Sequence, residues 1–541
     1  MLSSEFLNGN IAALTKAQGI CPPLGALPES MRVALTRTGV HLEMRLTDEE
    51  WQPLDAPWPE IGEIAWVHSG GDRDAEQLVA VGVGLGYGLA ARNHVKRVIA
   101  IEPHPGIATL FLSMHDWRQW FADGRLRLVT GPEYQGAADF ARMLDGLSDI
   151  AVVSHPLRTR WEPEVMARAT SVATRVAQNA KANGRTRRRF AGPYLLQTLS
   201  NLSAIAREAD VQALDGQFRG VPAVVVGAGP SLDDNVEELR ALHDRALIVT
   251  ADTALGPLVS HGVRPHIAVA VDSSELNARH VTSVAATHDV ALAAEGSVHP
   301  SAWQSFAGRI FTFRVANHDP WPWLHAAHVR RGEVKTWGSV LTSAFNLARR
   351  MGCDPIVFAG ADLAFTGMRP YCRGTIYDAM WQEWIDKGCT WEALMDEYFS
   401  RQPEVWRPDV FGHSTRTGPH LLSFRDWLVE QTSTGEERFI NATGAGILHG
   451  GRIEQARLTN ALAGAPPVPH LRRAVFERHA TCTGRSGDVA RVAHLLRQAH
   501  ERSSALPLQR WKDFAANTVT EDQILSAVFA SVPVCSRQSP V

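Results

Sequence analysis

The chain has 541 residues, of which 45% are hydrophobic, so it is long and apolar enough for several compact domains with cores of their own. Its 54 Lys and Arg residues nearly balance its 57 Asp and Glu residues, which excludes a strong overall field that would direct it to nucleic acid or to an anionic membrane. No run approaches the roughly 18 apolar residues of a membrane span, and the first residues lack the pattern of a signal peptide, so we expect a cytoplasmic protein without membrane insertion.

The first part of the chain predicts a small β-rich segment followed by a Rossmann-like domain. In residues 1–59, "MRVALTRTG" and "VHLEMRL" alternate apolar and polar positions around a Thr-Gly turn. In residues 60–160, "LVAVGVGLGYGLAARN" reads as a strand, a glycine-rich bend and a helix start, and "RVIAIEP" reads as a second strand. Together these patterns predict a Rossmann-like N-terminal domain.

The glycine-rich bend allows two interpretations. Gly82, Gly84 and Gly86 have the spacing that lets a backbone approach a nucleotide, and Glu102 ends the next strand, where a ribose-binding acid often lies. This combination is typical of a dinucleotide or S-adenosylmethionine site. The other interpretation is a scaffold whose tight turn merely needs glycine, and we favour it because a single glycine pattern is weak evidence.

The rest of the chain predicts a doubly wound domain between two helical regions. Apolar residues recur every three or four positions in residues 161–219, which we expect to form a helical connector. In residues 220–462, "AVVVGAG", "ALIVTAD", "IAVAVDS", "VALAAEG", "RIFTFRV" and "PIVFAGAD" are buried strands that alternate with helical segments. This alternation specifies a parallel sheet covered on both faces, hence a doubly wound α/β domain. Residues 463–541 again look helical and end in a tail that we expect to be disordered.

The turn in "VPAVVVGAGPSLDDN" predicts an anion site. Gly227 and Gly229 permit a sharp bend between strand and helix, and Pro230 suits the first helical turn. Ser231 and the amides that follow it can donate hydrogen bonds at the helix N-terminus. Because ligands of open parallel sheets bind beyond the carboxyl ends of the strands, we expect this turn to hold a phosphate or a carboxylate.

Acidic residues follow several other strands directly. They are expected to line the same edge, where they could bind a ribose, a metal or a substrate hydroxyl, or could simply cap the next helix. These residues are Asp252, with Thr253 beside it, Asp272, Glu295 and Asp362.

A second donor-rich turn, "KTWGSVLTSAFNLA", brings Gly338, Ser339 and Thr342 to the start of another helix. Two helix N-termini that face one crevice suit an acidic or phosphorylated ligand. The sequence therefore predicts one nucleotide-binding crevice that both turns share.

Several of these motifs resemble, in order, the central domain of the motility-associated factor (Maf) glycosyltransferases. They are "GAGPSL", "TADTALGPLVSHGVRPHIAVAVD", "TWGSVLTSAFNLARRMGCDPIVFAGADLAFTG" and "FINATGAGILHGG". That domain is grouped with the MptE-like pyrophosphokinases, which act on 6-hydroxymethylpterin. Upstream, "WVHSGGDRDAEQLVAVGVGLGYGLA" resembles the Rossmann-like N-terminal domain of the same family.

The resemblance implies a function and roles for particular residues. Maf proteins transfer a nonulosonic acid from a CMP-activated donor to Ser or Thr of flagellin in the cytoplasm. We expect no obligatory cofactor or metal, because hydroxyls and helix N-terminal amides can hold the single phosphate of the leaving nucleotide. Their core is similar to that of small bacterial sialyltransferases. By position, Gly229, Pro230 and Ser231 would contact the nucleotide, and Gly338 and Ser339 the phosphate or carboxylate of the donor. Asp362 would lie beneath the reacting sugar.

The resemblance also implies where the catalytic base should be sought. The related sialyltransferases carry it on a loop that follows the Gly-x-Asp motif, which here ends at Asp362. Three residues on such loops are candidates, namely Tyr371, His413 in "FGHST" and His449 in "ILHGG".

Two other functions stay open. A pyrophosphokinase that acts on a pterin-like alcohol would use ATP and Mg²⁺, with the strand-end aspartates as metal ligands. The number of acids favours it, whereas the additional N-terminal and C-terminal regions do not. A non-catalytic accessory protein that binds flagellin would not need the crevice residues, all of which are present.

Overall fold

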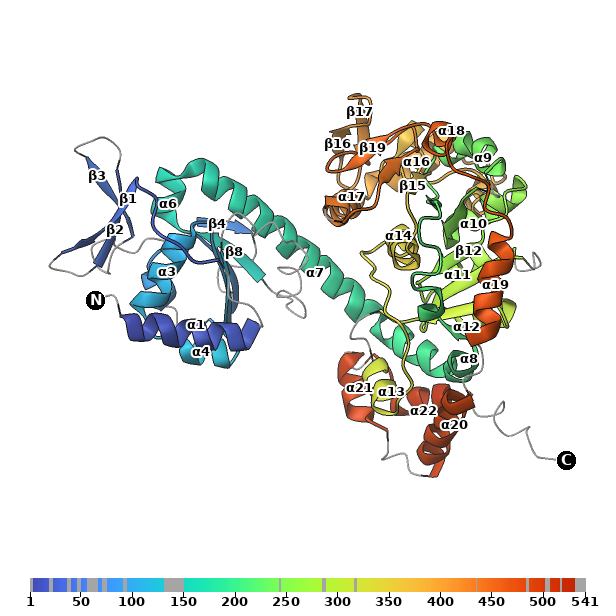
Figure 1. The fold of residues 1–541 in the computed structure, drawn as a ribbon, viewed down its shortest axis with the longest axis horizontal. Helices are drawn as coiled ribbons and strands as arrows, with labels where there is room; N and C mark the ends of the chain where they lie inside the picture. Colours follow the sequence, from blue (N-terminus) through green and yellow to red (C-terminus); the bar gives the residue numbers. More distant parts are fainter. Residues whose placement is uncertain are drawn as a thin grey trace. The chain divides into compact units, whose positions relative to one another are not determined.

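The computed structural model describes residues 3–530 with internal gaps at 19–22, 37–39, 46–49, 56–66, 71–74, 91–94, 131–149, 243–244, 285–288, 316–318, 434, 483–485, 502–505 and 516–517. The chain divides into two compact units, Met1–Arg187 and Arg188–Val541 (Figure 1). Each unit is considered by itself below. None of the described helices is long and apolar enough to cross a membrane.

The first unit contains two sheets. Three antiparallel strands, β1 (Met31–Leu35), β2 (Val40–Arg45) and β3 (Trp51–Asp55), form the smaller sheet. They follow a helix, α1 (Ser4–Gln18), which the sequence did not indicate. The larger sheet has the order β4-β8-β5-β6-β7, in which only β4 is antiparallel to its neighbour. Its strands are β4 (Val67–Gly70), β5 (Gln77–Val81), β6 (Arg97–Glu102), β7 (Leu126–Thr130) and β8 (Ile150–Ser154).

Helices accompany this larger sheet as a Rossmann-like fold requires. They are α2 (Tyr87–Ala90), α3 (Pro105–Met114), α4 (Arg118–Ala122), α6 (Pro156–Trp161) and the first part of α7 (Pro163–Ser200). Apolar side chains of β5, β6 and β8 pack against Met166 and Ala169 of α7, while others pack against α1 and α3. The predicted Rossmann-like N-terminal domain is therefore confirmed.

The second unit is built on a sheet of nine strands in the order β19-β18-β15-β10-β11-β12-β13-β14-β9. All of its strand pairs are parallel. The strands are β9 (Ala209–Asp210), β10 (Ala223–Val226), β11 (Leu247–Ala251), β12 (Ile267–Ala270), β13 (Ala291–Glu295), β14 (Ile310–Phe313), β15 (Ile356–Ala359), β18 (Phe439–Asn441) and β19 (Ile453–Gln455).

Both faces of this sheet are buried, which explains why its strands are apolar throughout. Val225 and Val249 face a cluster that includes α14 (Val340–Met351), α17 (Pro419–Ser433) and α19 (Leu471–Cys482). Val224 and Ile248 face the opposite side, which packs against α9 (Leu232–Arg240) and α10 (Asp252–Ser260). Other helices of this unit are α8 (Leu202–Arg207), η1 (Val211–Leu214), α11 (Glu275–Thr282), α12 (Pro300–Ser305) and α13 (Trp321–Ala326). The predicted doubly wound α/β fold is confirmed.

The order of the strands identifies the position at which a ligand is expected. From β10 the chain adds β11, β12, β13 and β14 on one side, and then β15 pairs with the other side of β10. The direction of winding therefore reverses between β10 and β15. In open α/β sheets, ligands bind beyond the carboxyl ends of the strands at such a reversal.

Three regions differ from the sequence-based expectation or add to it. The predicted helical connector includes β9, which extends the nine-stranded sheet beside β14. Between β15 and α17 the chain forms η2 (Thr366–Met368), α15 (Ile376–Ile385), α16 (Trp391–Ser400) and a hairpin of β16 (Val405–Pro408) and β17 (Ser414–Thr417). The C-terminal region is helical, with α18 (Leu458–Ala461), α20 (Ser486–Glu501), α21 (Leu508–Phe514) and α22 (Glu521–Ala530). The tail expected to be disordered, 534–541, lies outside the described residues.

Candidate functional site

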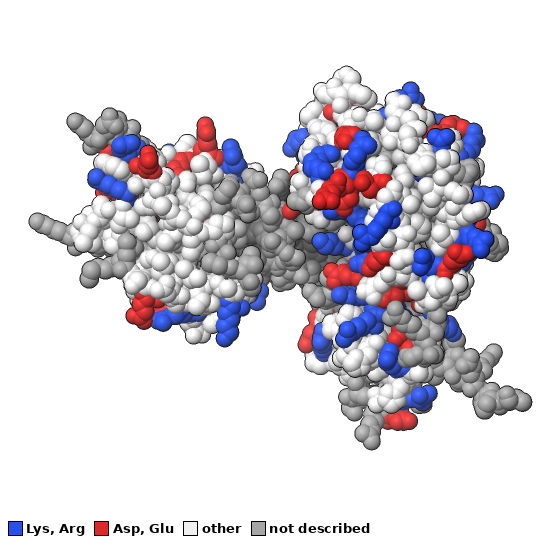
Figure 2. Space-filling model, in the orientation of Figure 1, with Lys and Arg blue, Asp and Glu red and all other residues white. Residues whose placement is uncertain are grey.

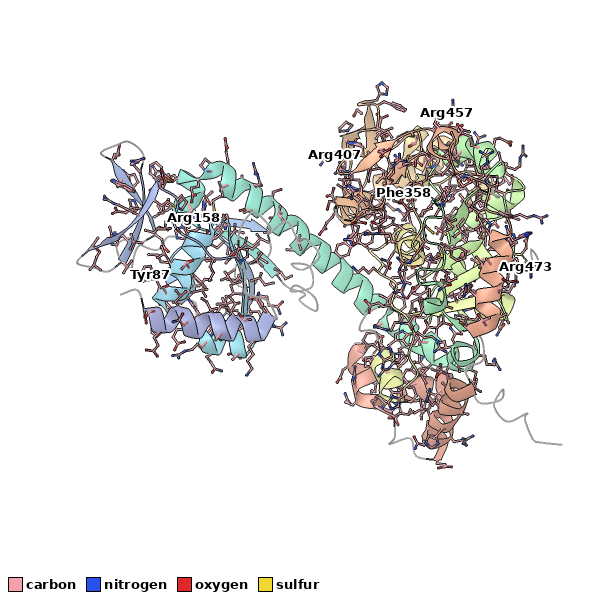
Figure 3. All side chains as sticks on the ribbon, viewed as in Figure 1. Tyr87, Arg158, Phe358, Arg407, Arg457 and Arg473 are labelled. Carbon is pink, nitrogen blue, oxygen red and sulfur yellow. The ribbon has the colours of Figure 1, made fainter. Side chains whose placement is uncertain are left out.

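The glycine-rich bend of the first unit contacts the chain's own charged side chains. The amide of Leu85 donates a hydrogen bond to Asp55 Oδ2 at 2.6 Å, and a Cβ on Gly84 would lie 3.0 Å from the Asp55 carboxyl carbon. Glu102, the acid proposed for a ribose, is fully buried and pairs at 2.5 Å with Arg158, which is labelled in Figure 3. Because Glu102 already has this partner, the structure favours the scaffold interpretation of Gly82, Gly84 and Gly86.

In the second unit, a cavity of about 290 Å³ lies at the carboxyl ends of β10 and β15. It is therefore at the reversal of the winding, where the topology predicts a ligand. Eight of the residues predicted from sequence line it, namely Gly227, Gly229, Thr253, Asp272, Gly338, Ser339, Asp362 and Tyr371.

The turns after β10 and β15 touch each other. Gly229 N donates to the Gly360 carbonyl at 2.8 Å, and Gly227 N donates to the Ala359 carbonyl at 2.9 Å. A Cβ on Gly229 would lie 2.7 Å from both the Gly360 carbonyl oxygen and the carboxyl carbon of Asp362, closer than such atoms approach. Glycine is therefore needed here for close contact.

Ser231 has a role that differs from the predicted one. Its hydroxyl donates to Asp362 Oδ2 at 2.6 Å, and both side chains are buried. Pro230 is also buried and does not line the cavity. Ser231 therefore holds Asp362 and does not present its hydroxyl to a ligand. Burial raises the pKa of Asp362, while the hydrogen bond from Ser231 acts in the opposite direction.

The second turn, at Gly338 and Ser339, also lines the cavity. Gly338 has a φ of +69°, and Ser339, the residue before α14, makes no capping hydrogen bond with its side chain. The hydroxyl of Thr342 donates to the Ser339 carbonyl at 2.6 Å and accepts from Trp337 N at 2.8 Å. Thr342 thus stabilises the turn through hydrogen bonds to its backbone, while Ser339 and the first amides of α14 can bind an anion.

Two carboxylates lie close together beyond β11 and β12. Asp252 is buried and accepts hydrogen bonds from the amide and hydroxyl of Thr253. Burial and the nearby Asp272 carboxylate raise the pKa of Asp252 to about 7. Asp272 lines the cavity together with Asn277, whose side-chain hydrogen bond opposes the rise in the Asp272 pKa caused by burial.

Tyrosine side chains form another part of the cavity wall. Tyr371 stacks on Tyr377, with ring centroids 4.8 Å apart, and Tyr398 lies in the same wall. Burial raises the pKa of Tyr371, so the phenol holds its proton at neutral pH. Tyr371 therefore suits a hydrogen-bond donor, and its predicted role as a base is unfavourable.

The predicted histidines lie outside the cavity lining, whereas a different histidine belongs to it. His413 is 80% exposed at the tip of the β16–β17 hairpin, and His449 Nε2 lies 3.2 Å from the Pro408 carbonyl. His420, at the start of α17, lines the cavity beside Phe424. Desolvation by the surrounding protein lowers its pKa, which favours the neutral imidazole that can accept a proton.

Glu295 is also outside the site. Its carboxylate accepts hydrogen bonds from Ser297 N at 2.6 Å and from the Trp321 indole at 3.1 Å. The sheet order explains this, because β13 is three strands from β10, a distance of about 14 Å.

The sequence reasoning missed several lining residues. His420, Tyr377, Tyr398 and Phe424 all come from the segment after β15. The Gly-Pro pair before His420 is a helix-start signal like the one before Ser231, and it could have drawn attention to this histidine.

The fold and cavity define a doubly wound α/β protein with a crevice at the reversal of its sheet. Residues 196–368 match the family described as 6-hydroxymethylpterin diphosphokinase MptE-like. The whole fold is similar to that of a Maf glycosyltransferase from Magnetospirillum magneticum AMB-1, with a TM-score of 0.54 and 14% identity over 99% of this chain and 90% of that one. The chain thus contains an MptE-like domain and has the fold of a Maf glycosyltransferase, as the sequence motifs predicted.

Two uncharacterized proteins of Treponema pallidum (strain Nichols) are also similar. One is 32% identical over 133 residues, which cover 22% of this chain and 34% of that protein. The other is 25% identical over 173 residues, which cover 30% of this chain and 57% of that protein. The similarity thus spans about a third of the first relative and somewhat more than half of the second.

Proposed function

We propose that the protein is a glycosyltransferase that moves a sugar from a nucleotide-activated donor to a hydroxyl group of an acceptor protein. The specific donor that we propose is a CMP-activated nonulosonic acid, and the acceptor is Ser or Thr of flagellin. The observation that carries this proposal is the cavity in which the Gly229 turn, the Ser339 turn and buried Asp362 meet.

The charges of the cavity favour a donor with a single phosphate. Among the described residues that line it, none is a lysine or an arginine, and two are aspartates. Helix N-terminal amides and the Ser339 hydroxyl can bind one phosphate without a cation. The three phosphates of ATP carry more charge, which normally requires Mg²⁺. CMP as the leaving group therefore suits this site better than a triphosphate.

His420 is the residue that we propose as the general base. Its neutral imidazole takes the proton of the acceptor hydroxyl as that oxygen bonds to the anomeric carbon. At the same time the bond between that carbon and the phosphate oxygen breaks, and CMP leaves with the bonding electron pair. Ser339 and the α14 amides stabilise the leaving phosphate, and Tyr371, which keeps its proton, can donate a hydrogen bond to it.

The proposed location is the cytoplasm. The four cysteines in the described part of the chain, Cys353, Cys372, Cys389 and Cys482, are free, in keeping with a reducing compartment. CMP-activated sugar and unassembled flagellin would both be accessible there.

A second function, pyrophosphoryl transfer to a pterin-like alcohol, is favoured by the description of the matching family and by Asp252 and Asp272. Those two carboxylates would have to hold Mg²⁺ together with the ATP oxygens, and Asp252 would first have to lose its proton. The Mg²⁺ would bridge the phosphates and neutralise their charge.

One experiment separates the two enzymes. Purified protein is incubated with flagellin and either a CMP-nonulosonic acid or ATP with 6-hydroxymethylpterin, with and without EDTA. We expect CMP release and a glycosylated flagellin, with excess EDTA lowering the rate by less than about half because helix N-termini can hold the phosphate. Consumption of ATP but not of the CMP-sugar, abolished by EDTA and restored by Mg²⁺, would transfer the assignment to the pyrophosphokinase.

A further inference from the structure

The β16–β17 hairpin exposes an unusual amount of apolar surface. In the described part of the chain, five large hydrophobic side chains are strongly exposed, and four of them lie between β15 and α17. Two of the four are on the hairpin, Trp406 at 46% and Phe411 at 67% exposure. Exposed aromatic side chains that gather on one element are typical of a protein interaction site.

The tip of the hairpin is ordered by its own hydrogen bonds. Asp409 Oδ1 accepts from the amides of Phe411 and His413, each at 2.8 Å, and Asp409 N donates to the His413 carbonyl at 2.7 Å. The hairpin projects at the top of the second unit (Figure 1), where the surface drawn in Figure 2 is mostly uncharged, and the side chain of Asp409 at the tip is only 16% exposed. Phe411 is thus presented by a loop whose conformation is already formed, which lowers the entropy cost of binding a partner.

Backbone hydrogen bonds connect this hairpin to the cavity. Phe365, which lines the cavity, donates from its amide to the Arg416 carbonyl of β17 at 2.8 Å. At the other end, Val410 N donates to the Gly446 carbonyl, and the neighbouring Ile447 N donates to the Asp362 carbonyl at 2.8 Å. The two ends of the hairpin are therefore anchored to the segments that carry Phe365 and Asp362, both of which line the cavity.

We infer that the β16–β17 hairpin is the docking element for the acceptor polypeptide, which binds Trp406 and Phe411 through apolar side chains near the hydroxyl to be modified. This inference rests on the proposed glycosyltransferase function. The hairpin itself carries only Arg407, Asp409 and Arg416 as charged residues, so its recognition is mainly apolar (Figure 3). Burial of exposed aromatic side chains is the usual main contribution at such an interface.

The test compares the wild type with the double variant Trp406→Ala/Phe411→Ala. About half of Trp406 and two thirds of Phe411 are exposed, so we expect the double variant to keep its fold, which circular dichroism and the melting temperature verify. Leu35→Ala is the matched control, because Leu35 is 74% exposed but belongs to the first unit. For each protein, CMP release from a CMP-nonulosonic acid is measured with water alone and with flagellin, and flagellin binding is measured by biolayer interferometry.

We expect the double variant to have a kcat/KM for flagellin at least tenfold lower than that of the wild type, because its KM for flagellin is higher. Its rate of donor hydrolysis by water should stay within twofold of the wild-type rate. Leu35→Ala should match the wild type in both reactions. An unchanged KM for flagellin in the double variant would overturn the inference. So would a wild type that dimerises through Trp406 and Phe411 in light scattering, because the hairpin would then contact a second copy.

Failure of the proposed function would look different. The wild type would then release no CMP from the donor under either condition. The hairpin inference would in that case be judged by binding alone, and equal affinity of the wild type and the double variant for flagellin would overturn it.

Discussion

Replacement of Gly229 by alanine tests the contact between the two turns on which the cavity depends. The new Cβ would lie 2.7 Å from the Gly360 carbonyl oxygen and from the carboxyl carbon of Asp362. Neither group can withdraw easily, because Gly360 accepts the Gly229 amide hydrogen bond and Asp362 is fully buried. The turn after β10 must therefore shift away from β15, which weakens the hydrogen bond from Ser231 to Asp362.

The structure gives the size of this effect. Overpacking of a buried site costs about 1–3 kcal/mol, and loss of a hydrogen bond to a charged group costs about 1.5–3 kcal/mol. We therefore expect Gly229→Ala to lower the free energy of unfolding by about 3 kcal/mol or, where the fold tolerates the shift, to weaken CMP binding by about a hundredfold.

Urea denaturation and titration calorimetry with CMP measure these two quantities. The control is Gly464→Ala, because a Cβ at Gly464 meets nothing within 4 Å. Its stability and affinity should stay within about 0.5 kcal/mol of the wild type. If Gly229→Ala has the same unfolding midpoint as the wild type and binds CMP within threefold of it, the two turns do not touch as described.

Three further predictions concern protonation and the first unit. His420→Asn should lower kcat for transfer to flagellin by about 10²-fold or more, as loss of a general base does. The control is His449→Gln, which lies outside the cavity and should leave kcat within about threefold of the wild type. Equal effects of the two variants would show that His420 is not the base. Because the pKa of Asp252 is raised to about 7 from an unfolded value of about 3.9, the folded state binds more protons between these values, so wild-type stability should fall as the pH rises from about 4 to 7. Asp252→Asn should lose the part of this dependence that Asp252 contributes, so its stability should fall less steeply with pH in urea titrations than that of the wild type. An unchanged slope would contradict the assignment. Because Glu102 pairs with Arg158, we expect titration calorimetry of the full chain with NAD or S-adenosylmethionine to give the same result for the wild type and for Glu102→Gln. Binding of either cofactor by the wild type that is lost in Glu102→Gln would restore the cofactor interpretation.

The elements that the sequence predicted well are those whose signals are local. A pattern of a few residues is enough to identify the apolar strands of the second unit and the turns at Gly227–Gly229 and Gly338–Ser339. The structure has these turns at the carboxyl end of a strand and at the start of a helix. The strand-end acids were recognised in the same way. Whether such an acid belongs to the site is a different question, and there the local signal was insufficient.

Glu295 illustrates the difference. Its sequence context matches that of Asp272 and Asp362, but the sheet order moves β13 away from the reversal between β10 and β15. The segment after β15 gives a second example. Tyr377 of α15 and Tyr398 of α16 line the cavity, and His420 joins them only after the chain has formed both helices and the hairpin. No local sequence pattern indicates that a segment this far along the chain folds back to line the cavity.

The sequence by itself thus determined the α/β class, the two domains of Rossmann type and the positions of the two turns beside the cavity, because hydrophobic period and turn chemistry depend on neighbouring residues. Tertiary structure alone decided which polar groups face the ligand. The Ser231 hydroxyl is taken up by Asp362, 131 positions away in the chain, and Glu102 is taken up by Arg158, 56 positions away. Such pairings depend on strand order and helix packing, which bring together residues that no sequence window contains, and they determine whether a polar side chain is free to bind a substrate or is used to stabilise the fold.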